Sequence, residues 1–363
     1  MLFYICPSVA QSCDYGDAQA LDFIFRLIDS RRRGLLLIHA SEKTYRILVD
    51  ALRKNGMGRM ADIVSIIAKR RREKSQLIDA LDRYVYVSMH ARDALSLRFK
   101  KMFILSPKFI NRTNLFYPPV LLAENLTDCS FYCAVIASNF NDDIPSALRR
   151  IRLFERFENG GGNNTHTVYE MHKQRMLDFC ICIVDSDRKC PDESDGDTAA
   201  FVRKVDARHP SSLCEVRVID MYSAENLIPL AEIKRQYVVG KNPSQVTEFS
   251  RTEQVRSSPS WQYLPLKKGI KGNDLKKQSA FGRYWRNELA LRGINVDCCE
   301  QDPCNCIILP AVSDKTLANA VATAKNGWAM DLNRESHNEV RGLYAMISLV
   351  LRSWLCVGQE IRV

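Results

Sequence analysis

The segment Cys182-Ile183-Val184-Asp185-Ser186-Asp187 decides how the fold of this chain is interpreted. It belongs to an apolar run from Phe179 to Val184 that ends abruptly in two aspartates one residue apart. Such a run, bounded by polar residues, is typical of a buried parallel strand. We therefore expect Asp185 and Asp187 at the carboxyl end of a strand, where open α/β sheets place their ligand sites.

The two aspartates predict a site for a divalent metal ion. Carboxylates that converge at a strand end repel one another, and a hard cation with oxygen ligands relieves this repulsion. The alternative is an ordinary turn after a strand, because Asp-Ser-Asp is also common turn sequence.

A second apolar run lies upstream and also ends in an acidic residue. Val120–Ala123 is followed directly by Glu124, and either Thr127 or Asp128 can cap a helix that begins there. The sequence therefore predicts a strand, an acidic strand end and a helix in that order.

A third strand is predicted downstream. Residues 215–221 alternate as a strand and lead into Ser223-Ala224-Glu225-Asn226-Leu227, while the flexible turn Gly160-Gly161-Gly162 separates the first two strands. The three strand ends carry, in chain order, Glu124, the pair Asp185 and Asp187, and Glu225.

This ordered set resembles the TOPRIM fold, the metal-binding module of topoisomerases, primases and the overcoming-lysogenization-defect nucleases. It is most similar to the stand-alone TOPRIM-like nucleases of bacterial abortive-infection and anti-phage systems. The matching positions are Glu124, Thr127-Asp128, Phe131-Tyr132, Gly160 to Gly162, Asp185 with Asp187, and Glu225-Asn226-Leu227. The resemblance covers roughly residues 116–235, about a third of the chain. Where the family usually has glycine after the first glutamate, this chain has Asn125.

The motifs and the resemblance together imply an α/β protein with a central TOPRIM-like parallel-sheet domain. They imply Mg²⁺ or Mn²⁺ as the cofactor, with oxygen ligands from Glu124, Asp128, Asp185, Asp187 and Glu225. The expected catalytic residues are Glu124, Asp185, Asp187 and Lys189. Glu124 would bind the metal or take a proton from water, and Arg188 and Lys189 would steady the charge of the phosphate.

The composition favours a protein that binds a polyanion and resides in a reducing compartment. A net charge of +10 suits nucleic acid, although it fits a ribosome-associated or simply soluble protein equally well. The 13 cysteines are an odd number, and several lie in apolar strands, which favours reduced thiols in the cytoplasm over disulfides. The first 13 residues lack a basic signal-peptide region, and no apolar stretch approaches the roughly 20 residues that span a bilayer. We expect no membrane association.

The 363 residues suggest two or three domains. Residues 1–115 are expected to form an N-terminal α/β or helical domain, residues 116–240 the TOPRIM-like metal-binding catalytic domain, and residues 241–363 a C-terminal basic and aromatic, mainly helical region. The polar segment from Lys241 to Ser260, which contains two prolines, predicts a linker or extended loop.

Basic and aromatic residues interleave between Trp261 and Arg286, which suits a phosphate track with stacking platforms. The alternative is an amphipathic helix from Lys276 to Arg292 that buries its aromatic side. The lysines of the track are Lys267, Lys268, Lys271, Lys276 and Lys277.

Two features of the N-terminal region can each be interpreted in two ways. The basic runs Arg31–Arg33 and Lys69–Arg72 suit solvated helix ends or contacts with nucleic acid. Asp14, Asp17 and Asp22 suit a second nuclease site of the PIN type, or ordinary helix caps and turns.

A cysteine cluster near the C-terminus offers a second type of metal site. Cys298, Cys299, Cys304 and Cys306 can hold a structural Zn²⁺ ion, or they can remain reduced cysteines in a loop. Their adjacent and alternate spacings are poorer for zinc than paired Cys-x-x-Cys knuckles.

The sequence therefore predicts a cytoplasmic, divalent-metal-dependent nuclease that cleaves phosphodiester bonds in DNA or RNA as an effector of anti-phage defence. A partner ATPase or reverse transcriptase and an oligomeric state are compatible with this role. The alternatives are a non-catalytic nucleic-acid-binding or assembly subunit that keeps the fold, and a primase-like nucleotidyl transferase.

Overall fold

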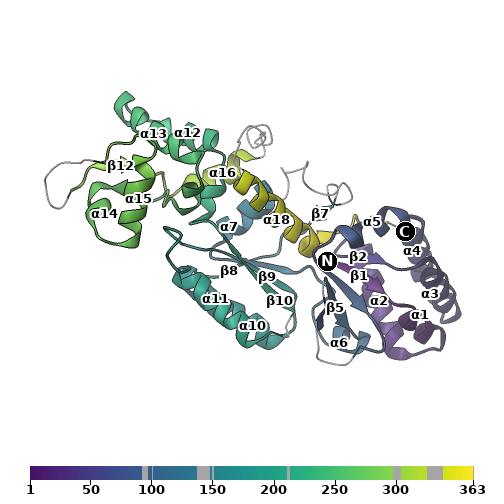
Figure 1. Ribbon diagram of the computed structural model, residues 1–363. Coiled ribbons are helices and arrows are strands. Elements are labelled where there is room, and N and C mark those ends of the chain that lie inside the picture. The colour runs from purple at the N-terminus through teal and green to yellow at the C-terminus, as the bar shows by residue number, and fades with distance from the viewer. Residues whose placement is uncertain are drawn as a thin grey trace.

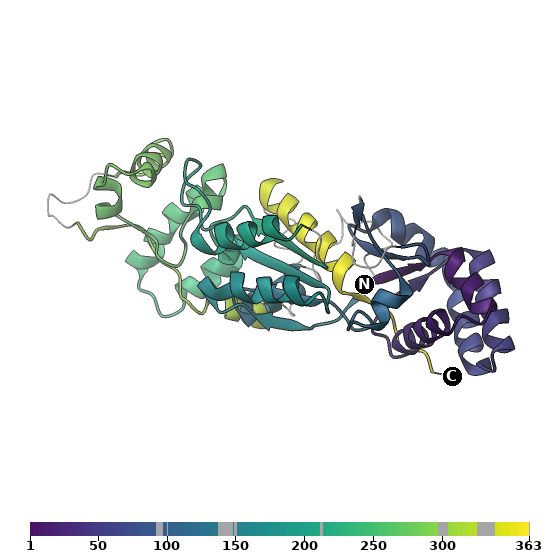
Figure 2. The same ribbon diagram turned by 90° about the horizontal axis from the view of Figure 1, so that it is seen from below.

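The computed structural model describes residues 1–91, 97–99, 101–136, 148, 151–210, 213–296, 304–324 and 338–362. The protein is α/β, as expected, with two mainly parallel sheets and helices packed against them. An N-terminal unit, a central sheet and a helical region follow one another along an elongated molecule (Figure 1), and the view from below shows the same succession (Figure 2). In the described part of the chain, no helix is long and apolar enough to cross a membrane.

The N-terminal unit is α/β, the first of the two expected options. Its strands are β1 (Leu2–Ile5), β2 (Leu37–His39), β3 (Tyr84–Val87), β4 (Leu97–Phe99) and β5 (Met102–Leu105), and its helices are α1 (Pro7–Asp14), α2 (Ala18–Arg32), α3 (Glu42–Lys54), α4 (Gly58–Lys69), α5 (Arg71–Ala80) and α6 (Pro107–Asn111). The strand order is β2-β1-β3-β5-β4, and β4 pairs with β5 in the antiparallel sense.

The acidic residues of this unit serve capping and surface pairing. Asp17 caps α2, because its Oδ1 accepts a hydrogen bond from the backbone N–H of Ala20 at 2.9 Å. Asp14 pairs with Lys54 at 3.4 Å, and Asp22 is exposed. These contacts favour the capping interpretation over a second nuclease site.

The central sheet has four parallel strands in the order β10-β9-β6-β8. The strands are β6 (Val120–Ala123), β8 (Phe157–Asn159), β9 (Cys180–Asp185) and β10 (Cys214–Ile219), so the three predicted strands are confirmed. The first strand, β6, has β8 on one side and β9 on the other. The chain therefore reverses its direction of progress across the sheet between β6 and β9, and such a switch point is where doubly wound sheets bind ligands.

Both faces of the central sheet are covered, which explains the continuous apolar strands. On one face, Leu122, Cys182 and Val184 pack against α10 (Thr165–Arg175) and α11 (Asp197–Arg208). On the other face, Leu121 and Ile183 join the large core that also includes α7 (Leu126–Phe131), the π-helix η1 (Tyr132–Ile136) and α18 (Asn338–Leu355). Figure 1 shows α10 and α11 together on one side and α7 and α18 on the other.

A mainly helical region covers the carboxyl end of the central sheet (Figure 1). It contains η3 (Ala224–Leu227), α12 (Leu230–Val238), α13 (Pro243–Arg256), η4 (Pro259–Tyr263), β11 (Ile270–Lys271), α14 (Gly272–Lys276), α15 (Ala280–Ala290), β12 (Ile307–Leu309) and α16 (Thr316–Ala324). The last helix, α18, returns to the central sheet, and β13 (Cys356–Val357) after it pairs with β7 (Arg152–Leu153).

The predicted linker from Lys241 to Ser260 is wrong, because most of it is the helix α13. Asn242 is the N-cap, Pro243 occupies the first turn, and Gln245 completes a capping box with Asn242. Proline is favoured at the first helical position, since its missing N–H has no partner there in any case. Pro243, which suggested a break in regular structure, is therefore the first residue of a helix.

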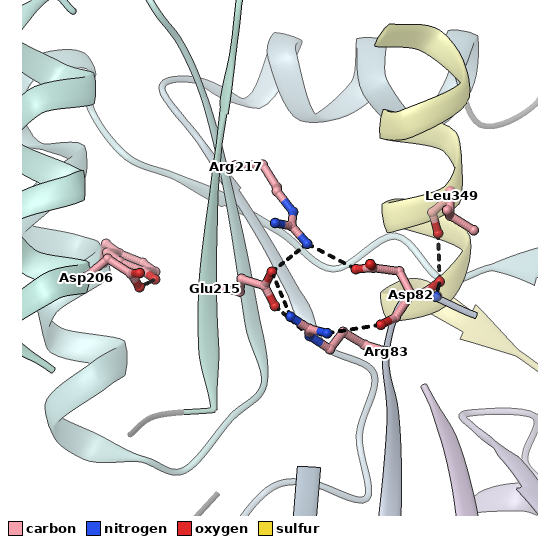
Figure 3. Close-up of polar contacts among 8 residues, drawn as sticks. Asp82, Arg83, Asp206, Glu215, Arg217 and Leu349 are labelled. Carbon is pink, nitrogen blue, oxygen red and sulfur yellow. Dashed lines mark hydrogen bonds and ion pairs between the residues drawn. The ribbon is translucent and has the colours of Figure 1, made fainter. Parts of the chain in front are cut away.

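Paired charges join the N-terminal unit to the central sheet (Figure 3). Glu215, at the amino end of β10, is 4% exposed and accepts from Arg83 Nε at 2.9 Å. Arg217 Nη2 lies 2.5 Å from the same carboxylate and 3.1 Å from Asp82 Oδ2. The backbone N–H of Asp82 donates to Ser353 of α18 at 2.7 Å, so three parts of the chain meet in this cluster.

Candidate metal centre

Acidic residues gather at the carboxyl edge of the central sheet, at the switch point between β6 and β9. They are close enough for each to affect the ionisation of others in the group, which comprises Glu124, Asp128, Asp185, Asp187 and Glu225. All five carboxylates that the sequence predicted as metal ligands thus lie within electrostatic reach of others in the group. Glu124 directly follows β6, Asp185 ends β9, and Glu225 lies in η3 after β10.

Asp185 is the most firmly held of these carboxylates. Its Oδ1 accepts a hydrogen bond from the hydroxyl of Tyr132 at 3.1 Å, and its Oδ2 accepts one from the backbone N–H of Ala224 at 2.9 Å. Burial, followed by the charges of Asp128 and Glu124, raises the pKa of Asp185 well above its ordinary value. Tyr132 belongs to the aromatic pair of the predicted motif, but its contact with Asp185 was not expected from the sequence.

Asn125, and neither Thr127 nor Asp128, caps the helix α7. Its Oδ1 accepts from the backbone N–H groups of Thr127 and Asp128 at 2.9 and 3.2 Å, and Asp128 Oδ2 accepts from the backbone N–H of Asn125 at 3.1 Å. This reciprocal arrangement satisfies otherwise unpaired N–H groups of the first turn. The φ angle of Asn125 is −148°, an extended conformation that needs no glycine.

Asp128 therefore has two roles, in the capping box and in the carboxylate group. It is 8% exposed, and burial together with the charge of Glu225 raises its pKa to about 6. Burial, followed by the charges of Asp187 and Asp128, raises the pKa of Glu124 to about 7. Protons are thus held at this edge of the sheet at pH values where isolated carboxyl groups are fully ionised.

Glu225 is only 1% exposed, and its charge is incompletely matched. The Nζ of Lys267 lies 2.8 Å from its Oε1, whereas Oε2 has no hydrogen-bond partner among the described residues. Burial alone would lower the pKa of Lys267, but the adjacent Glu225 raises it above the ordinary value. A buried acceptor without a donor is costly, and such an atom marks a position where a cation can bind favourably.

The segment around Glu225 is fixed from the helical region. The side-chain amide of Asn226 donates to the carbonyls of Trp261 and Leu264 at 2.8 and 2.9 Å. The indole of Trp261 and the guanidinium of Arg256 both donate to the carbonyl of Asn226, at 2.7 and 3.1 Å. The orientation of Glu225 thus depends on residues about 30 positions further along the chain.

The loop after β9 requires unusual backbone geometry. Asp187 has a φ of 55°, in the left-handed region that aspartate tolerates better than most residues. A Cβ atom at Gly196 would lie 2.5 Å from the Cβ of Asp187, so glycine is needed there. Burial raises the pKa of Asp187, and the charges of Lys268 and Lys189 oppose that rise.

The glycine turn fixes the backbone around Glu124. The N–H of Gly160 donates to the carbonyl of Ala123 at 2.8 Å, and the N–H of Gly162 donates to that of Glu124 at 3.0 Å. A Cβ atom at Gly160 would lie 2.7 Å from the carbonyl oxygen of Ala123 and 2.3 Å from Thr165 Oγ1. The turn is therefore a structural support of the acidic edge.

The aromatic residues of the predicted phosphate track are not stacking platforms. Trp261 and Trp285 are 1% and 0% exposed. The helix α15 buries Trp285 and Leu289, which agrees with the alternative prediction of an amphipathic helix. The indole N–H of Trp285 donates to the carbonyl of Lys189 at 3.0 Å. These rings hold the loops of the acidic edge in place, because their apolar bodies pack in the helical region while their N–H groups reach outward.

The two basic residues after the Asp pair differ in their surroundings. Arg188 forms ion pairs with Asp220 and, at 3.7 Å, with Asp195, so its charge is already matched. Lys189 is exposed and acts electrostatically on Asp187. Of the two, Lys189 is the one that forms no ion pair within the described residues.

The carboxylate group fits a hard divalent cation in its chemistry. In the described ranges, no three His, Cys, Asp or Glu side chains already lie close enough together to enclose a metal ion. The donor set nevertheless consists of carboxylate oxygens alone, which Mg²⁺ and Mn²⁺ prefer. Burial first, and neighbouring carboxylates second, raise the pKa values of Glu124 and Asp128, and Oε2 of Glu225 has no donor in the described structure, so a bound cation would stabilise the ionised forms of these groups.

The predicted zinc site lies partly outside the described residues. Cys298 and Cys299 fall in the segment 297–303, Cys304 is buried, and Cys306 is partly exposed. No disulfide joins the cysteines within the described ranges. The zinc site stays a prediction.

No protein-family model matches this chain, and no curated protein or solved structure matches it either.

Proposed function

We propose that this protein is a divalent-metal-dependent nuclease with a TOPRIM-like central domain, acting on DNA or RNA in anti-phage defence. The observation that carries the proposal is the convergence of five carboxylates at the switch point of a parallel sheet, with lysines as the nearby cations. Carboxylates whose environments raise their pKa values in this way are typical of functional sites. The order of motifs along the chain supports the nuclease assignment in particular.

The cation would be held by the carboxylates of Glu124, Asp128, Asp185, Asp187 and Glu225. When bound, a divalent cation lowers the pKa of water and neutralises charge at phosphorus. Tyr132 and the N–H of Ala224 keep the carboxylate of Asp185 in a fixed orientation. The orientation of Asp185 would thus be set before a cation arrives, whereas the other carboxylates would have to move closer together to enclose the ion.

Glu124 is the best candidate for the general base. Without metal, burial and neighbouring carboxylates raise its pKa to about 7, and a cation held by the other carboxylates would lower this value and leave Glu124 deprotonated to accept a proton from water. Its backbone is fixed by the glycine turn through Gly162.

Lysines from two segments would hold the phosphate beside the carboxylates. Lys267 and Lys268 come from the loop before β11, and Lys189 comes from the loop after β9. Lys267 affects the ionisation of Glu124, Asp128 and Asp187, so its ammonium group lies within electrostatic reach of most of the group. These cations would attract a phosphodiester to a site that would otherwise repel it.

The decisive experiment compares the purified wild-type protein with the double variant Asp185→Asn, Asp187→Asn. The wild type should cleave labelled single- and double-stranded DNA and RNA with Mg²⁺ or Mn²⁺, and its Tm should rise with either ion by mass action. The double variant should remain folded but lose both responses. Asp192→Asn is the matched control, because Asp192 is an exposed aspartate in the same loop.

Cleavage by the folded double variant would overturn the assignment of the centre. A wild-type protein that is stabilised by Mg²⁺ and binds nucleic acid, but cleaves none of the four substrates, would favour the non-catalytic alternative.

A further inference from the structure

A second surface feature lies at the opposite edge of the central sheet from the carboxylate group. It is a groove with a volume of about 460 Å³, and we call it the joint groove. Its lining includes Arg33, Asn114, Tyr117, Pro118, Phe154 and Arg156. The volume lies within the range of small-molecule sites.

The joint groove is built where the N-terminal unit meets the central sheet. Arg33 follows the end of α2, whereas Pro118 and Arg156 lie just before β6 and β8. These positions are at the amino ends of the strands, so the joint groove and the carboxylate group are separated by the length of the sheet. Junctions between units of a fold are common places for ligand sites.

Two aromatic rings of the joint groove remain in contact with solvent. Tyr117 is 50% exposed and Phe154 is 37% exposed, unlike the buried tryptophans near the carboxylate group. Both rings line the same groove, and exposed aromatic rings are the kind of group on which nucleobases stack. Tyr117 and Phe154 are therefore more accessible for stacking than Trp261 and Trp285 of the predicted phosphate track.

Arg33 supplies an available cation beside these rings. In the basic run at the end of α2, Arg31 donates to the carbonyl of Gln359 and Arg32 pairs with Asp29 at 2.8 Å. Arg33 is exposed and forms no ion pair within the described ranges. The three arginines therefore differ in role. Arg31 and Arg32 make contacts within the folded chain, and Arg33 lines the joint groove.

The other wall of the joint groove is rigid and electrically balanced. Arg156 Nη1 donates to Asp178 Oδ1 at 2.8 Å and to the carbonyl of Pro118 at 3.1 Å. The side-chain amide of Asn114 donates to Asp178 Oδ2 at 3.4 Å. Both oxygens of Asp178 are therefore engaged, which limits their repulsion of an anion at Arg33.

We propose that the joint groove binds a nucleotide, with its base stacked on Tyr117 and Phe154 and its phosphate paired with Arg33. A planar guanidinium matches the geometry of phosphate oxygens, and aromatic rings accept any base because every base has a π-face. The same chemistry is offered by a free mononucleotide and by the phosphorylated end of a nucleic-acid strand. The site is independent of the metal centre and goes beyond the proposed nuclease function.

The test uses the full chain with Asp185→Asn and Asp187→Asn in buffer with EDTA, so that the carboxylate group neither cleaves nor binds metal. Isothermal titration calorimetry with 5′-AMP, adenosine and a 5′-phosphorylated dinucleotide should detect binding of at least one phosphorylated probe, and weaker binding of adenosine. Arg33→Gln and Tyr117→Ala should each weaken binding about ten-fold, which is the usual scale of one phosphate contact or one stacked base. Tyr117→Phe should retain binding, because it keeps the ring.

Arg175→Gln is the matched control, since Arg175 is an exposed arginine at the end of α10 and lies outside the joint groove. Full binding of 5′-AMP identifies a free nucleotide as the ligand, and binding of the dinucleotide alone identifies a strand end. The proposal is overturned if neither phosphorylated probe binds below about 1 mM, or if the Arg33 and Tyr117 variants bind like the control. Cleavage by the wild type is measured separately, so failure here leaves the nuclease proposal unaffected.

Discussion

The two ends of the central sheet both bury acidic residues, but only one end neutralises them. At the amino end, Glu215 receives two arginines, with Arg83 Nε at 2.9 Å and Arg217 Nη2 at 2.5 Å. At the carboxyl end, Glu225 is even less exposed, yet its ion-pair partner in the described structure is the single Lys267, whose side chain is 42% exposed.

This difference separates a structural role from a functional one. A buried carboxylate with matched guanidinium groups joins segments of the chain, as Glu215 does between the N-terminal unit and the sheet (Figure 3). A group of buried carboxylates with insufficient positive charge stores repulsion, which a bound cation can relieve. The following predictions test whether the two ends differ in this way.

The largest effect is expected for Glu124→Gln. Loss of the general base should reduce the cleavage rate by about 10²- to 10⁴-fold. The Tm increase produced by Mg²⁺ should persist in part, because the other carboxylates remain. Single-turnover cleavage of a labelled oligonucleotide and thermal melting measure the two effects. A wild-type rate in this variant would place the base elsewhere.

Glu215→Gln and Glu225→Gln should have opposite consequences for stability. Glu215→Gln leaves two arginines without their buried partner and should lower the free energy of unfolding by about 3 kcal/mol. Glu225→Gln removes mutual repulsion and frees Lys267 to solvent, so it should be neutral or stabilising without metal. Urea unfolding of both variants provides the comparison, and equal destabilisation would contradict the distinction between the two ends.

The pH dependence of stability should also reflect the carboxyl end of the central sheet, where the carboxylates lack matching positive charge. The folded-state pKa values of Glu124 and Asp128, about 7 and about 6, are raised above those of the unfolded chain. Their stabilising contribution to the free energy of unfolding is therefore fully present below about pH 4, and it is lost as the pH rises through 6 and 7. Without metal, this loss should be on the order of 2–3 kcal/mol between pH 5 and 8.

Glu124→Gln should flatten that pH profile, because it removes the group with the higher pKa of the two. With Mg²⁺ present, the stabilisation by metal should grow as the pH rises, since the cation competes with protons for the same oxygens. Melting curves at several pH values, with Mg²⁺ or EDTA, test both statements. A variant profile parallel to that of the wild type would show that another group is responsible.

The smallest effect concerns individual lysines of the predicted track. Lys268 acts on Asp187, whereas Lys277 pairs with Asp274 at 3.6 Å. Lys268→Gln should reduce the slope of log affinity against log salt by about 0.7 to 0.9, and Lys277→Gln should leave it unchanged. Fluorescence anisotropy with a labelled oligonucleotide at several salt concentrations measures the slope. Equal slopes in both variants would remove Lys268 from the substrate site.

The sequence by itself determined the parallel strands and the acidic residues at their ends. Apolar runs such as Val120–Ala123 and Phe179 to Val184 report burial on both faces of a sheet, because this signal is local and repeats within a few residues. Since parallel strands end at one edge, the clustering of Glu124 and Asp185 followed from the strand assignments alone. The capping residue of α7 and the helix α13 were misassigned, because several polar residues can cap and proline both breaks and begins helices.

Only the tertiary structure decided which charges are matched. Lys267 reaches Glu225, Arg83 reaches Glu215, and Trp285 holds the carbonyl of Lys189. These partners are separated by 42, 132 and 96 positions, and no local pattern encodes such pairings. The energy of a buried charge depends on the atoms within a few ångströms of it, and the packing of distant segments supplies those atoms.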